Sequence, residues 1–105
     1  MTNAIMVVKT NPVGGREDEF NAWYSGQHVP EILRVPGFVG ARRYVALDQP
    51  VDDGGDAGFR YVAIYEIEGP VPDALAALGA AGIEPSPAMD ERTSVAVYTT
   101  FPPKP

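Results

Sequence analysis

Glycine and proline divide this chain into short segments. Each occurs 11 times in 105 residues, and both are spread along the whole length. They therefore indicate frequent turns between separate elements rather than a low-complexity tract. No run of 18 apolar residues occurs, so we expect no membrane segment. The length predicts a single domain over residues 1–105.

Four segments have the apolar, β-branched pattern of strands. They are residues 4–10, 38–47, 59–69 and 92–101. Gly40 marks the expected position of a bulge in the second strand. In the third strand, Tyr61 and Tyr65 fall on one face while Val62 and Ile64 fall on the other.

The segment GGREDEFNAWYSG, residues 14–26, predicts the first helix. Its first turn is acidic, which suits a helix N-terminus. Phe20, Trp23 and Tyr24 have the spacing of a buried helical face. Gly26 is then expected to end the helix as its C′ residue.

Pro30 predicts a new helical start, because proline is favoured at the first position of a helix. Proline also disfavours α geometry in the preceding residue. We therefore expect residues 27–29 to form a short break between two helical pieces, the second covering residues 30–35. A further short helix is expected over residues 72–82, followed by a connection over residues 83–91.

The predicted order of elements is β-α-β-β-α-β, which is the split arrangement of an α+β, ferredoxin-like fold. Two helices can cover only one face of the four-stranded sheet. The other face also carries apolar side chains, either the tyrosines or Val62 and Ile64 of the third strand. A monomer rarely leaves such a surface in water. We therefore predict a homodimer that pairs sheet on sheet.

Residues 20–44, FNAWYSGQHVPEILRVPGFVGARRY, resemble the dimeric α+β barrel superfamily, and within it the EthD-like and related small uncharacterised families. The matching positions are Trp23, Tyr24, His28, Pro30, Pro36, Gly37, Arg43 and Tyr44. The resemblance implies a pocket between sheet and helices, lined by aromatic side chains, with the motif histidine near its mouth. The superfamily contains cofactor-free monooxygenases, polyketide cyclases, lactone isomerases, haem-dependent enzymes and members without known activity, so the fold does not decide the chemistry.

Composition excludes several classes of function. The net charge is −6, and no stripe of Lys and Arg offsets it, so nucleic-acid binding is not expected. Cysteine is absent, which removes disulfides, thiolate metal sites and thiol nucleophiles. The first residues lack the pattern of a signal peptide. We expect a cytoplasmic protein.

His28 is the strongest candidate for a catalytic residue. Its imidazole can both accept and donate a proton near neutral pH. The alternative is structural: a cation near the end of the first helix is favourable, or the ring holds the kink through a hydrogen bond. A metal site is not expected, because His28 is the only histidine and no H-x-x-x-H spacing exists.

Six further residues are candidates around His28. Tyr24 and Arg43 are candidates for orienting a substrate oxygen, although Arg42 and Arg43 could equally form surface or interface ion pairs. Trp23 is a candidate for the pocket wall, with core packing as the alternative. The remaining candidates belong to either the pocket or the dimer core, and they are Tyr44, Tyr61 and Tyr65.

Three functions remain open. The first is a cofactor-independent enzyme of the isomerase, cyclase or monooxygenase type, acting on a small apolar aromatic or polyketide-like molecule with His28 as general acid/base. The second is a non-catalytic module that binds a ligand in the same pocket. The third is haem binding with His28 as axial ligand. The acidic segment 48–58 does not match a calcium loop and is expected to be a solvated hairpin loop.

Overall fold

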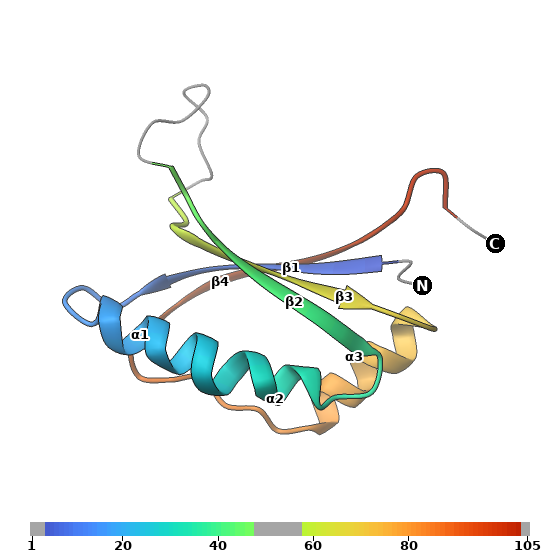
Figure 1. Ribbon diagram of the computed structural model, residues 1–105, viewed down its shortest axis with the longest axis horizontal. Coiled ribbons are helices and arrows are strands. Elements are labelled where there is room, and N and C mark those ends of the chain that lie inside the picture. Colours follow the sequence, from blue (N-terminus) through green and yellow to red (C-terminus); the bar gives the residue numbers. More distant parts are fainter. Residues whose placement is uncertain (1–3, 48–57, 104–105) are drawn as a thin grey trace.

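The computed structural model describes residues 4–47 and 58–103. Its elements follow the predicted β-α-β-β-α-β order, with the first helical region in three parts (Figure 1). The strands are β1 (Ala4–Pro12), β2 (Phe38–Val45), β3 (Tyr61–Ile67) and β4 (Met89–Thr99). The helical elements are α1 (Glu17–Trp23), the π-helical turn η1 (Tyr24–His28), α2 (Val29–Leu33) and α3 (Val71–Ala80). Except for Gly58, the loop expected at 48–58 lies outside the described residues.

The four strands form one antiparallel sheet in the order β2-β3-β1-β4. This order places the first and third strands at the centre, as the ferredoxin-like arrangement requires. All the helices of the described residues lie against one face of the sheet, and within these residues the opposite face carries none (Figure 1). The α+β, ferredoxin-like prediction is confirmed.

Two strands, β1 and β4, extend beyond the apolar segments from which they were predicted, because their backbone pairing continues past those segments. A register shift between Thr10 and Pro12 lets β1 continue and pair Pro12 with Met89. Consequently β4 begins at Met89, inside the connection predicted for residues 83–91. The bulge expected at Gly40 is confirmed, because the β2–β3 register shifts between Phe38 and Gly40.

The hydrophobic core lies between the sheet and the helices. Phe20, Tyr24 and Ile32 enter it from the helical side, and all three are buried. Tyr65 and Ile67 of β3 meet them from the sheet and are fully buried. The third strand therefore turns its tyrosines toward the helices.

The break predicted at residues 27–29 is wrong. The chain stays helical from Glu17 to Leu33, and Val29 has φ −59° and ψ −49°, within the α region. Gly26 is not a left-handed C′ residue, since it lies within η1 and is not among the glycines with positive φ. Instead of breaking, the helix widens by one residue over η1.

Pro30 explains why the helix widens at this point. A proline inside a helix has no N–H for the carbonyl four residues earlier, and its ring clashes with that carbonyl, here that of Gly26. In η1 the N–H of Val29 donates to the carbonyl of Tyr24, five residues back. The wider turn lets the helix pass a proline without an interruption.

The side chains of the central strands that do not face the helices lie on the uncovered face of the sheet. Register pairs Val7 with Ile64 and Lys9 with Val62, so these side chains share that face. Of the two alternatives for this face, the structure therefore selects Val62 and Ile64.

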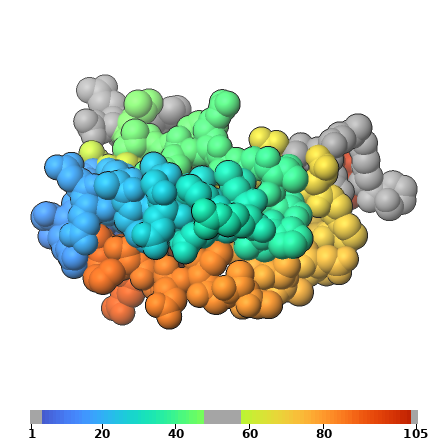
Figure 2. Space-filling model, turned by 60° about the horizontal axis from the view of Figure 1, so that its bottom comes forward, coloured from blue at the N-terminus to red at the C-terminus, as the bar shows by residue number. Residues whose placement is uncertain are grey.

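The covered face is enclosed by two bands of chain. Figure 2 shows the surface of the first helical region, in blue to teal, lying beside the orange surface of α3 and the segment that follows it. Within the part of the chain that the structure describes, no helix is long and apolar enough to cross a membrane.

Candidate functional site

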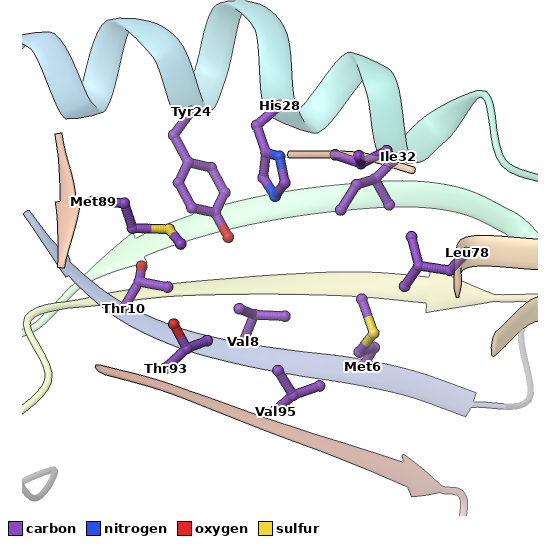
Figure 3. A pocket seen from close by; sticks show the side chains of 11 residues that line it. Met6, Val8, Thr10, Tyr24, His28, Ile32, Leu78, Met89, Thr93 and Val95 are labelled. Atoms are coloured by element: carbon purple, nitrogen blue, oxygen red, sulfur yellow. The ribbon is translucent and has the colours of Figure 1, made fainter. Parts of the chain in front are cut away.

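A cavity of about 250 Å³ lies between the first helical region and strands β1 and β4 (Figure 3). This volume is near the lower end of small-molecule sites, which span roughly 300 to 1,000 Å³. Most of its lining is apolar. The lining residues are Met6, Val8, Thr10, Tyr24, His28, Ile32, Leu78, Ile83, Met89, Thr93 and Val95.

The two ring residues of the cavity come from the two ends of η1. Tyr24 and His28 both project from the helix toward the sheet (Figure 3). Tyr24 is 1% exposed, while His28 is half-buried. Their rings meet edge to face with centroids 4.9 Å apart. His28 is therefore among the residues that line the cavity.

Trp23 stacks on the other side of the imidazole. The ring centroids of Trp23 and His28 are 4.6 Å apart, with an interplanar angle of 24°. Residues five apart in a regular α-helix lie about 140° apart around the axis, so they cannot stack. The π turn brings them onto one side of the helix. The stacking on Trp23 that fixes the orientation of His28 is thus a consequence of the widened turn.

Burial favours the neutral form of His28. Removal from water lowers the pKa of the imidazole below its usual value of 6.5, and the positive charge of Arg43 acts in the same direction. The carboxylate of Glu31 opposes this by favouring the charged form. Nδ1 of His28 is buried without a hydrogen-bond partner. A neutral imidazole in such surroundings can accept a proton at neutral pH.

Tyr24 is a neutral hydrogen-bond donor. Burial raises its pKa, although Tyr65 and the charge of Arg43 partly offset that effect. The hydroxyl oxygens of Tyr24 and Tyr65 are both buried, and neither makes a hydrogen bond of ordinary geometry, although the two lie close enough to affect each other's pKa. Burial also raises the pKa of Tyr65, and the neighbouring Tyr24 adds to the shift. A buried donor without a partner is costly, so a ligand oxygen at Tyr24 would remove that cost.

Arg43 lies behind Tyr24 rather than in the cavity lining. Its guanidinium carbon is 4.4 Å from the centroid of the Tyr24 ring, which is a close cation–π contact. Nη1 donates to the Ser25 hydroxyl at 3.0 Å, and Nη2 donates to Oδ1 of Asn21 at 2.9 Å. Through these contacts Arg43 fixes Tyr24 and the helix on the sheet.

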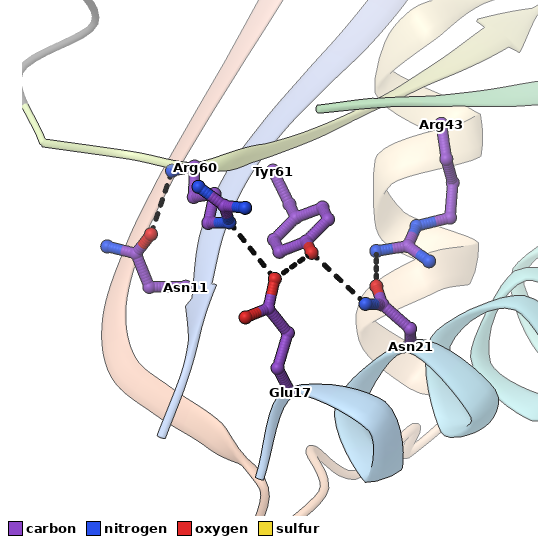
Figure 4. A network of polar contacts seen from close by, with 6 residues as sticks. All are labelled: Asn11, Glu17, Asn21, Arg43, Arg60 and Tyr61. Carbon is purple, nitrogen blue, oxygen red and sulfur yellow. Dashed lines mark hydrogen bonds and ion pairs between the residues drawn. The ribbon is translucent and has the colours of Figure 1, made fainter. Parts of the chain in front are cut away.

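A polar network continues from Arg43 along α1 (Figure 4). The side-chain amide of Asn21 donates to the Tyr61 hydroxyl at 3.1 Å. That hydroxyl in turn donates to the carboxylate of Glu17, which also accepts from Arg60 at 3.0 Å. The hydrogen bond from Tyr61, followed by that from Arg60, lowers the pKa of Glu17. The network attaches α1 to β2 and β3.

The predicted pocket residues separate into three groups. Trp23, Tyr24 and His28 gather at the cavity, where Trp23 supports the imidazole from outside the lining. Tyr61 and Tyr65 lie on the helix-facing side of the sheet but outside the lining. Tyr44 pairs with Val62 and therefore lies on the uncovered face, where it is 47% exposed.

Sequence reasoning missed the floor of the cavity. Alternate residues of β1, namely Met6, Val8 and Thr10, pair with Val97, Val95 and Thr93 of β4. The signal was present in the period-two pattern of these strands. The sequence alone does not show which face of these strands lines a cavity, because that depends on the pairing of β4 with β1.

His28 is the one histidine that could ligate a haem iron. Among residues 4–47 and 58–103, no three His, Asp or Glu side chains lie close enough together to hold a metal ion.

Similarity to solved structures extends over nearly the whole chain. An EthD family protein from Bacillus halodurans superposes with a TM-score of 0.61 at 12% identity, covering 96% of this chain and 100% of the other. An uncharacterised NIPSNAP domain protein from Burkholderia xenovorans gives 0.60 at 12% identity, covering 97% and 98%. A candidate monooxygenase from Shewanella loihica gives 0.57 at 15% identity, covering 96% and 97%.

These similarities establish the fold. The chain has the same ferredoxin-like α+β fold as these EthD-like, NIPSNAP domain and monooxygenase-type structures. No model of a known protein family matches the sequence, and no curated protein sequence does. At 12–16% identity the likeness carries no activity from one protein to another.

The pKa of His28 can be measured directly, because the chain has one histidine. We expect proton NMR of its imidazole to titrate with a midpoint below 6.5, since burial disfavours the charged ring. The folded state then binds fewer protons than the unfolded state near that pH. The free energy of unfolding should therefore fall as the pH drops from 7 through the pKa of folded His28. In His28→Gln that part of the pH dependence should be absent, and a midpoint at or above 6.5 would contradict the burial argument.

Proposed function

We propose that this protein binds a small apolar molecule in the cavity and transfers a proton on it without a cofactor, with His28 as general acid/base. The observation that carries the proposal is the state of His28: a half-buried imidazole with a lowered pKa, held by Trp23 in the wall of an apolar cavity. Perturbed titratable groups in a cavity are typical of catalytic sites.

The reaction we propose begins with removal of a proton from a carbon next to a carbonyl. The imidazole of His28 takes the proton, and the electron pair of the broken C–H bond moves onto the carbonyl oxygen as an enolate. The Tyr24 hydroxyl donates a hydrogen bond to that oxygen. Glu31 stabilises the imidazolium that forms, since its charge favours the protonated ring. Return of the proton to a different carbon completes an isomerisation. In a ring closure, the enolate carbon instead forms a bond to a second carbonyl carbon of the same molecule, and the oxygen of that carbonyl takes the proton from His28.

In this proposal Arg43 is a positioning residue: it holds Tyr24 in place and does not contact the substrate. Its guanidinium faces the Tyr24 ring and bonds to Ser25 and Asn21, so it has no place in the lining. It supports the orientation of the Tyr24 hydroxyl. Trp23 is likewise a positioning residue, because it stacks on the imidazole of His28 from outside the lining.

The same cavity also supports a non-catalytic ligand-binding role. In that case ligands would change the fluorescence of Trp23, the one tryptophan, while His28 would transfer no proton. An assay of base strength inside the cavity separates the two roles before a natural substrate is identified.

The compound 5-nitrobenzisoxazole provides such an assay. A base removes its ring proton, the N–O bond breaks, and a coloured cyanophenolate forms. We expect the protein to accelerate this reaction and His28→Gln to lower the rate by about 100-fold or more, the lower range for general base catalysis. The rate should rise with pH and level off with a midpoint below 6.5, where folded His28 becomes neutral.

The matched control is Gln27→Ala, which alters the exposed neighbour of His28 outside the lining. It should keep the rate of the original protein. Equal rates for the original protein and His28→Gln, with both folded, would refute catalysis by His28. Fluorescence changes at Trp23 without acceleration would favour the binding role instead.

We also propose that two copies pair through the uncovered sheet face. Val7 and Ile64 lie side by side at its centre, and Tyr98 and Tyr44 extend the apolar surface toward both edges. The tyrosines are 55% and 47% exposed in the single chain. Contiguous apolar surface of this kind typically marks an interface.

Sedimentation measures this assembly directly. We expect a dimer at micromolar concentrations and a monomer for Val7→Asp, because a carboxylate there would be buried between its apolar cross-strand neighbours Ile64 and Ala96. Ala76→Asp, on the exposed side of α3, should remain dimeric. A monomeric original protein would contradict the proposed pairing.

A further inference from the structure

The floor of the cavity changes from apolar to hydroxylated along β1. Met6 and Val8 present hydrocarbon, while Thr10, two residues further, presents a hydroxyl and is 2% exposed. Thr93 of β4 is the direct cross-strand neighbour of Thr10 and lines the same end. Met6 and Thr10 are four residue steps apart along the strand, a span of about 13 Å.

The opposite wall changes in the same direction. The hydroxyl of Tyr24 lies above Val8, on the side of the cavity where Met89 and Thr10 also lie, whereas Ile32 and Leu78 lie toward Met6 (Figure 3). The imidazole of His28 projects into the cavity between Tyr24 and Ile32. The Tyr24 hydroxyl is buried and makes no hydrogen bond of ordinary geometry, although Tyr65 lies close enough to affect its pKa, so a ligand oxygen would compete with Tyr65 for this donor. The cavity therefore has one end that carries hydroxyl groups beside Met89, one end lined by hydrocarbon alone, and the candidate base between them.

No charged group is among the lining residues that the structure describes. Arg43 is separated from the cavity by the ring of Tyr24, and burial keeps His28 neutral at neutral pH. A carboxylate in this cavity would lose its hydration without gaining a cation, which is strongly unfavourable.

We infer that Thr10, Thr93 and Tyr24 form a recognition site for an uncharged oxygen substituent, so that the ligand class is a neutral keto or hydroxy compound with a hydrocarbon body. The oxygen binds at the threonine end, the hydrocarbon body lies along Val8 and Met6, and a carbon near the oxygen comes under His28. The inference rests on the proposed function for the role of that carbon. The oxygen site itself depends only on the cavity.

Calorimetry with three probes of the same shape tests this site. They are 2-naphthol, 2-methylnaphthalene and 2-naphthoate, which carry a hydroxyl, a methyl and a charged carboxylate on one ring system. We expect 2-naphthol to bind about tenfold more tightly than 2-methylnaphthalene, and 2-naphthoate to bind most weakly. A single hydrogen bond accounts for about 2- to 10-fold.

Three variants assign the preference to the named hydroxyls. Thr93→Val, Thr10→Val and Tyr24→Phe should each reduce the preference for 2-naphthol by about 2- to 10-fold while 2-methylnaphthalene binds as before. Thr93 is exposed at the edge strand, so Thr93→Val keeps the test valid if a substitution at buried Thr10 or Tyr24 impairs folding. The control is Ser94→Ala, one residue away on the other face of β4, which should leave the preference unchanged.

The outcomes distinguish this inference from the proposed catalysis. Equal affinity for 2-naphthol and 2-methylnaphthalene, or a preference that survives in Thr93→Val, overturns the oxygen site even when proton abstraction by His28 is observed. Tightest binding of 2-naphthoate overturns the assignment of a neutral ligand. Failure of all three probes to bind overturns the oxygen site and the ligand-binding part of the proposed function together. A confirmed preference without His28-dependent proton abstraction leaves the oxygen site in place and removes the catalysis.

Discussion

The π turn at Tyr24–His28 is the feature on which the rest of the site depends. It exists because Pro30 cannot complete the hydrogen bond to the carbonyl four residues earlier, while the N–H of Val29 reaches back five residues to Tyr24. The helix therefore continues without a break, and its widened turn brings Trp23 onto the face of the imidazole. One backbone constraint thus orients the candidate base toward the sheet.

Packing around the turn explains the electrostatics of the site. Arg43 faces the Tyr24 ring and bonds to α1, and the network through Asn21, Tyr61 and Glu17 attaches the same helix to the sheet. The charged groups therefore lie behind the aromatic layer, and the cavity side stays largely apolar. Desolvation then dominates the pKa values of His28 and Tyr24, so both rings are neutral at neutral pH. A neutral base beside a neutral donor suits proton transfer on an uncharged molecule.

Much of the architecture could be predicted from the sequence, because strand alternation, turn residues and the motif around His28 are local signals. The break at residues 27–29 was predicted wrongly, since Gly26 and Pro30 carry the same local signals whether a helix stops or widens. The choice between the two depends on tertiary packing of Tyr24 and Ile32 against the sheet. The threonines of the cavity were missed for a related reason: their pairing across β1 and β4 is non-local, and no single segment reveals it.

The most direct test of the central claim uses the single tryptophan and single histidine of the chain. In two-dimensional NMR, cross-relaxation between the indole protons of Trp23 and the imidazole protons of His28 can arise from one pair of residues within a chain. Stacked rings with centroids 4.6 Å apart predict strong cross-peaks. A regular helix, or a break after Gly26, would separate the rings and leave those cross-peaks absent, and that result would contradict the account of the site.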